Sequence, residues 1–239
     1  MAKSEIPYII LCSLVLGYTI SLVMAKSNQI AVTFNSMIIF SLIALAIISI
    51  NVIAKKLAAL KLGCYAEIQP LTWRRYWFYE SAYLRFGFPS WLFWPIIFTW
   101  FSFGKLFWLA NNTFEAQATP SRVNRRYADL TEFDIGLIAS AGITANLFVA
   151  VIATFFHNPA AITFAYLNLW YAFFNILPFP GYDGGKIFFG EKLFYVFMFS
   201  FTCIVLILLH FAPVFTTLIS AFLVALICVF LFYGLREKG

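Results

Sequence analysis

Repeated apolar runs, each long enough to cross a bilayer, constrain the fold of this chain more than any other feature. They cover residues 7–24, 34–54, 135–157, 160–178, 188–210 and 213–234. About 20 apolar residues make a spanning helix, and hydrocarbon tolerates only backbone whose polar groups are bonded within the protein. Only 11% of the 239 residues are charged and 63% are hydrophobic, which excludes an ordinary soluble domain. The sequence predicts an all-α, polytopic integral membrane protein.

A seventh apolar segment, 88–110, is interrupted by two prolines, Gly104 and Lys105. If it spans, the 16 basic residues divide seven to nine between the two faces. If it dips in and returns, fifteen of the 16 lie on one face and Lys26 alone lies opposite. Because Lys and Arg concentrate in cytoplasmic loops, we expect six spanning helices, a re-entrant hairpin over 88–110, and both termini in the cytoplasm. Such a hairpin must pack against the helices.

The net charge and the cysteine content limit the kinds of partner that we expect for this chain. The net charge of +6 fits cytoplasmic loops rather than nucleic-acid binding. The four cysteines include no CxxC pair, so we expect neither a disulfide framework nor a zinc knuckle. Residues 63–69 partly alternate apolar and polar side chains and predict a short strand. The expected partners are the lipid bilayer and another membrane protein or the subunits of a larger membrane complex.

One acidic residue, Asp183, lies beside a long apolar run, in the stretch Asn175-Ile-Leu-Pro-Phe-Pro-Gly-Tyr-Asp-Gly-Gly185. An ionisable side chain at that depth is costly and indicates a function. Pro178 and the proline two residues later end the preceding helix, because proline removes a backbone donor and restricts its neighbour. Asn175 could satisfy backbone groups freed at this break, and the two glycines could allow a turn after Asp183.

The spacing Asn-x-x-Pro-x-Pro-x-x-Asp-Gly-Gly resembles the third-ligand motif of the site-2 protease family of intramembrane zinc metalloproteases. The run from Ile138 to Leu147 is similar to the Ala-Gly helix of that family, with Ile143 at its usual proline, and residues 56–65 resemble the segment after its HExxH motif. The resemblance implies a site-2 protease-like core over 34–190. A first transmembrane helix and outer loop would occupy 1–33, and two C-terminal transmembrane helices would occupy 191–239.

In that family two histidines of HExxH bind zinc together with the Asp, and the Glu activates water. Counting back from the resembling segment places this register on residues 51–55, where Asn51 and Lys55 replace the ligands and Val52 replaces the base. The resemblance therefore implies a degenerate site with no catalytic residue. Zinc is not expected, and Asp183 is the only retained ligand position. The site residues are Asn51, Val52, Lys55, Asn175, Pro178 and Asp183. The two histidines, His157 and His210, are expected on the far face.

Two arrangements of the charged residues remain open. Lys55 and Asp183 could form an ion pair that replaces the positive charge of the metal, with Asn51 hydrogen-bonding nearby. Alternatively, Lys55 extends to the interface and Asp183 is solvated. The leading functional interpretation is an inactive pseudoprotease that binds membrane helices or serves as a structural subunit. The alternatives are an active intramembrane enzyme with Asp183 as acid or base, and a proton- or ion-coupled transporter using Asp183.

Overall fold

The computed structural model describes residues 5–28, 32–75, 83–119 and 129–236. This part of the chain is mostly helical, with eight helices and four strands in the order α1 (Ile6–Asn28), α2 (Phe34–Lys61), β1 (Cys64–Pro70), β2 (Trp73–Arg75), β3 (Tyr83–Phe88), α3 (Ser90–Phe101), β4 (Asn112–Ala118), α4 (Glu132–Thr154), α5 (Pro159–Ile176), α6 (Asp183–Gly190), α7 (Lys192–Leu208) and α8 (Val214–Arg236).

Among the described residues, four helices are long and apolar enough to cross a membrane: Ile6–Lys26, Phe34–Lys61, Glu132–Thr154 and Val214–Leu235. They are consistent with the predicted integral membrane protein. α5 and α7 fall in the other two predicted spans but have only 18 and 17 residues. The run predicted over 188–210 is wrong at its start, because the helix breaks at Glu191. The carboxylate of Glu191 accepts from the Leu193 N–H at 3.3 Å and caps α7.

The chain forms two compact units, one comprising residues 1–49 and 67–115 and the other residues 50–66 and 116–239. The helix α2 contributes its first part to the first unit and its last part, including residues 51–55, to the second. Each of the two units is a group of residues that contact one another. The division at residues 33 and 190 follows from the family resemblance and stays a prediction.

Two small sheets form beside the helices. β1 pairs with β4, and β2 pairs with β3 in antiparallel register, with Trp73 opposite Phe88. The strand predicted over 63–69 is therefore confirmed as β1. No strand was predicted over the polar stretch after Asn111, which forms β4. Its residues alternate weakly, and pairing with β1 decides their conformation.

In the first unit, the segment predicted to be a hairpin doubles back on itself, because both of its ends bond to Leu71. The Leu71 carbonyl accepts from the Trp91 N–H at 2.9 Å, and the Leu71 N–H donates to the Asn111 carbonyl at 3.0 Å. The outgoing arm is the 12-residue helix α3, and the returning arm is irregular. Phe98 and Trp108 stack across the two arms with ring centroids 5.0 Å apart.

The hairpin runs along α1 for most of its length. Near its base, the Asn111 amide donates to the Cys12 carbonyl at 2.9 Å. At its turn, a Cβ built on Gly104 would lie 3.4 Å from the Lys26 Cβ. From Cys12 to Lys26, α1 rises about 21 Å. Lys105 therefore lies at the same end of α1 as Lys26, and the expectation that Lys105 lies with the other basic residues is wrong.

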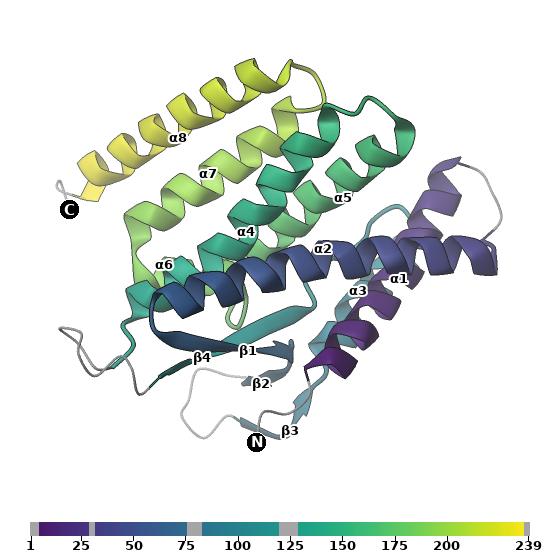
Figure 1. The fold of residues 1–239 in the computed structure, drawn as a ribbon, viewed down its shortest axis with the longest axis horizontal. Coiled ribbons are helices and arrows are strands. Elements are labelled where there is room, and N and C mark those ends of the chain that lie inside the picture. The colour runs from purple at the N-terminus through teal and green to yellow at the C-terminus, as the bar shows by residue number, and fades with distance from the viewer. Residues whose placement is uncertain (1–4, 29–31, 76–82, 120–128, 237–239) are drawn as a thin grey trace. The chain divides into compact units, whose positions relative to one another are not determined.

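In the second unit, α4 packs on α5 and α6, and α7 packs on α5, α6 and α8 (Figure 1). A capping box begins α4: Thr131 Oγ1 accepts from the Asp134 N–H at 3.1 Å, and Asp134 Oδ2 accepts from the Thr131 N–H at 3.2 Å. Asn158 caps α5, and Pro159 occupies its first turn. These local signals produce an antiparallel α4–α5 pair with a short connection.

The depth of the hairpin can be tested by labelling from either side of sealed vesicles. A cysteine at position 105 should react with a membrane-impermeant maleimide from the same side as a cysteine at position 26. It should react from the side opposite to a cysteine at position 5, at the other end of α1. The wild-type chain gives the background from the native cysteines. Labelling of positions 105 and 5 from one side would contradict the packing of the turn beside Lys26.

Candidate functional site

Asp183 is positioned by a break between two helices of the second unit. α5 ends at Ile176 because Leu177, which precedes Pro178, has extended backbone at φ −59° and ψ 138°. Gly181 then takes φ 89°, a left-handed conformation that favours glycine. The chain enters α6 at Asp183. The carboxylate thus lies in the first turn of a helix, where the helix dipole favours negative charge.

The two glycines after Asp183 allow close packing rather than a turn. A side chain at Gly184 would collide with the backbone carbonyl of Ile176. A Cβ at Gly185 would lie 2.5 Å from the carbonyl oxygen of Phe179. Both glycines lie inside α6, and the left-handed turn is made earlier by Gly181. The expectation that they allow a turn after Asp183 is therefore wrong; they let α6 pack against the end of α5.

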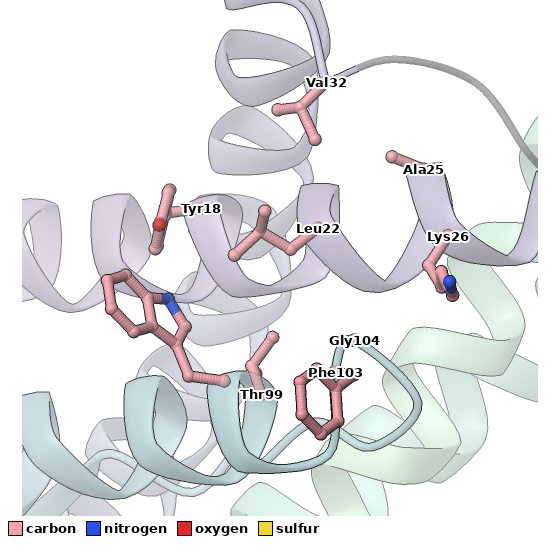
Figure 2. A pocket seen from close by; sticks show the side chains of 9 residues that line it. Tyr18, Leu22, Ala25, Lys26, Val32, Thr99, Phe103 and Gly104 are labelled. Atoms are coloured by element: carbon pink, nitrogen blue, oxygen red, sulfur yellow. The ribbon is translucent and has the colours of Figure 1, made fainter.

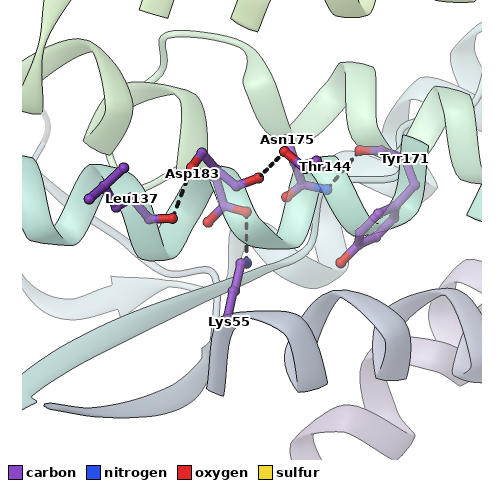
Figure 3. Close-up of polar contacts among 7 residues, drawn as sticks. Lys55, Leu137, Thr144, Tyr171, Asn175 and Asp183 are labelled. Atoms are coloured by element: carbon purple, nitrogen blue, oxygen red, sulfur yellow. Dashed lines mark hydrogen bonds and ion pairs between the residues drawn. The ribbon is translucent and has the colours of Figure 1, made fainter. Parts of the chain in front are cut away.

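Lys55 reaches Asp183 from α2 and forms a fully buried ion pair. The Lys55 Nζ lies 2.7 Å from Asp183 Oδ2, and both side chains have 0% exposure (Figure 3). This confirms the predicted contact and excludes the alternative in which Lys55 extends to the interface and Asp183 is solvated. Two opposite charges removed from water require each other, because either one alone would be stranded.

The backbone of α4 approaches this face of α2 at Gly142. A Cβ built on Gly142 would lie 2.7 Å from Asn51 Nδ2 and 2.7 Å from Lys55 Cε. Val52 is also buried and contributes only apolar packing. The side chain of Asn51 is buried but makes no hydrogen bond within the described part of the chain. The expectation that Asn51 hydrogen-bonds beside the ion pair is therefore wrong.

Asn175 and Pro178 are brought near the site but differ in exposure. Asn175 is buried, and its amide donates to the Tyr171 carbonyl one turn earlier at 2.8 Å (Figure 3). It therefore does not satisfy groups freed at the proline break, as had been expected. Pro178 is exposed at the start of the turn.

Sequence reasoning missed two further buried amides in this unit. Asn168 lies seven residues before Asn175, and its amide donates to the Phe164 carbonyl at 2.8 Å. Asn146 lies one turn after Gly142 in α4 and is also buried. The signal was present in the spacing, since residues four or seven apart share one helix face. The buried faces of α4 and α5 are thus more polar than their hydropathy suggests.

The two histidines lie far from the ion pair, as predicted. α6 packs against the first turn of α4, where a Cβ at Gly190 would lie 2.7 Å from the Glu132 carbonyl oxygen. His157 follows the opposite end of α4, and His210 follows the end of α7. Both are exposed. Within the described ranges, no group of three or more His, Cys, Asp or Glu side chains is arranged to hold a metal ion.

Comparisons with protein-family models, with curated proteins and with solved structures give no match to this chain.

The energetic role of the ion pair can be measured by removing its members singly and together. Lys55→Met should lower the free energy of unfolding by about 3–5 kcal/mol, because it strands the Asp183 carboxylate. The double variant Lys55→Met/Asp183→Ala should recover most of this loss. Unfolding in detergent micelles measures both. A double variant as unstable as Lys55→Met would show that the charges do not depend on each other.

The close approach at Gly142 gives a second test. Gly142→Ala should lower the free energy of unfolding by about 1–3 kcal/mol, because the added methyl group displaces Lys55 or Asn51 from a packed interface. Gly234→Ala in α8 is the matched control, since nothing lies within 4 Å of a Cβ at that position. It should be neutral or slightly stabilising. Equal effects of the two substitutions, measured by thermal unfolding, would contradict the packing.

Proposed function

We propose that this chain is a site-2 protease-like membrane protein without protease activity, and that it acts by binding a partner in the membrane. The partner would be a transmembrane helix or the neighbouring subunits of a larger assembly. One observation carries the proposal: a lysine ammonium group lies 2.7 Å from the carboxylate that would be the third zinc ligand.

The geometry supports the register that the family resemblance suggests. That register pairs residues 51–55 with Asp183 and with an Ala-Gly helix, three segments far apart in the sequence. In the structure, Lys55 contacts Asp183, and both Lys55 and Asn51 lie against Gly142. A chance match between short motifs gives no reason for the three segments to meet at these residues.

The residues at this place do not fit a zinc ion. Catalytic zinc usually has three protein ligands and one open position. Asn51 offers a weak amide oxygen, the Lys55 ammonium repels a cation, and Val52 can neither accept nor donate a proton. Only Asp183 remains as a ligand, and its charge is already balanced by Lys55. The site therefore lacks the general base and two of the three ligands that zinc would need to activate water.

Burial favours binding over other chemistry at Asp183. An acid or base must come within hydrogen-bond reach of its substrate, and a relay must exchange its proton or ion with a pathway. Asp183 and Lys55 have no exposed side-chain surface. A cavity of about 400 Å³ beside the turn is lined by Glu132, Pro180, Gly181, Gly185, Lys186 and Phe189, and by neither member of the pair.

The proposed topology has six spanning helices, a re-entrant hairpin over 88–110 and both termini in the cytoplasm. With Lys105 beside Lys26, fourteen of the 16 basic residues lie on the cytoplasmic face in this topology. This asymmetry agrees with the positive-inside rule. The turn before Asp183 then lies at the cytoplasmic side, where Pro178, Phe179 and Pro180 are exposed and available to a partner.

Purification from native membranes tests binding against chemistry. A binding protein should retain a stoichiometric integral-membrane partner through size-exclusion chromatography in mild detergent. The Lys55→Met/Asp183→Ala variant should retain that partner equally, because it keeps the fold and removes only the charges. Loss of the partner from a folded double variant would show that the charged pair itself acts on the partner. Absence of any stoichiometric partner from the wild type would contradict the proposal.

Restoring the family motif tests the register independently of any partner. The triple variant Asn51→His/Val52→Glu/Lys55→His places two imidazoles four residues apart on the helix face that contacts Asp183. We expect it to bind one zinc per chain after metal loading and dialysis. The same variant with Asp183→Ala should lose most of this zinc. Failure of a folded triple variant to bind zinc more tightly than the wild type would contradict the site-2 protease register.

A further inference from the structure

A cavity lies between α1 and the hairpin, and neither member of the ion pair lines it. It has a volume of about 780 Å³, in the range of small-molecule sites. Figure 2 shows Tyr18 and Leu22 on α1 opposite Thr99 and Phe103 of the hairpin, with Lys26 at the end beside Gly104. All of these residues belong to the first unit.

The residues that line the cavity are uncharged along most of α1 and positively charged at one end. From Tyr18 to Ala25 the wall on α1 carries no charge, and Lys26 follows in the last turn of the helix. Tyr18 and Lys26 are about 12 Å apart along the helix axis. None of the residues that line the cavity is acidic. The cavity therefore combines an apolar groove with one positive end.

Exposed aromatic side chains lie along the hairpin wall of the cavity. Trp100 is 63% exposed and Phe103 is 82% exposed. Trp100 lies in the last turn of α3, and Phe103 lies in the turn that meets the C-terminal end of α1, shortly before Lys105. Aromatic rings gather at the level of the lipid headgroups, and basic residues there attract anionic lipids. The charged end of the cavity is thus placed where a headgroup would lie.

We propose that this cavity binds an anionic phospholipid from the leaflet at the Lys26 end of α1. The Lys26 ammonium binds the phosphate, and one acyl chain lies in the groove between α1 and α3. The uncharged part of the groove suits an acyl chain, because apolar surface is stabilised when it is removed from water. The lipid would fill the space between α1 and the end of α3.

The test uses the full-length chain in detergent and native mass spectrometry. Phosphatidylglycerol and phosphatidylcholine with identical acyl chains are titrated, and the apparent Kd of the first bound lipid is measured for each. The wild type should prefer phosphatidylglycerol. Lys26→Gln should weaken phosphatidylglycerol binding about fivefold and phosphatidylcholine binding less, because the choline cation already neutralises the phosphate of phosphatidylcholine. Lys26→Arg should retain the preference.

Lys192→Gln is the matched control, since it removes another exposed lysine at a helix end and should change neither Kd. Ala25→Phe fills the groove without changing its charge, and it should weaken both lipids. Helix content and monodispersity confirm folding, and the Lys26 series decides the question if Ala25→Phe fails to fold.

Three results would overturn the assignment. Equal affinities of the wild type for the two lipids, or equal effects of Lys26→Gln and Lys192→Gln, would show that the cavity does not select an anionic headgroup. Displacement of phosphatidylglycerol by millimolar inorganic phosphate would indicate a site for a soluble anion. Absence of any bound lipid would assign the cavity to another occupant, such as a helix of a partner protein.

Discussion

The buried ion pair between Lys55 and Asp183 is the interaction on which the second unit depends. Each charge loses its hydration and keeps the other as its compensation, because both side chains are fully buried and 2.7 Å apart. This requires the end of α2, the Gly142 face of α4 and the start of α6 to stay together. The proline break and the glycines of α6 serve the same contact, since they place the first turn of α6 against the end of α5.

The ion pair can also be compared with the metal ion of a zinc protease, since either would hold the same helices together. In a zinc protease, a divalent cation would draw the HExxH helix and the Asp toward each other. Under the proposed site-2 protease register, the Lys55 side chain supplies one positive charge at that place, 2.7 Å from Asp183. The ion pair holds the helices together, and neither of its side chains has exposed surface. This burial supports the proposal that the protein acts by binding.

Much of this could be predicted from the sequence, because long apolar runs and proline breaks act locally. The helices α1, α2, α4, α5 and α8 fall in predicted apolar runs, the strand β1 was predicted, and residues 88–110 double back as expected. The Lys55–Asp183 contact was one of two arrangements that the sequence left open. The start of α7 was misplaced, since a single capping Glu191 outweighed a continuous apolar run. The strand β4 was missed because its partner β1 lies about 50 residues away, and local propensity does not encode such pairing.

The errors in placing individual side chains have a common physical cause. Asn51 was assigned a hydrogen bond beside the ion pair from the register of the resemblance, and Asn175 was assigned one at the proline break from its sequence neighbours. In the structure Asn175 donates within its own helix, and Asn51 is packed against Gly142. The position of Lys105 was inferred from a rule about loops, whereas its turn is fixed by packing against α1. Side-chain partners across helices depend on tertiary packing, which a single sequence specifies only through spacing.

The most direct measurement is the metal content of the wild-type protein, purified in detergent without chelators, compared with Asp183→Ala. If Lys55 replaces the metal, elemental analysis should find well under one equivalent of zinc per chain in both proteins. One equivalent of zinc in the wild type, lost in Asp183→Ala, would contradict this account and indicate a functioning metal site at Asp183.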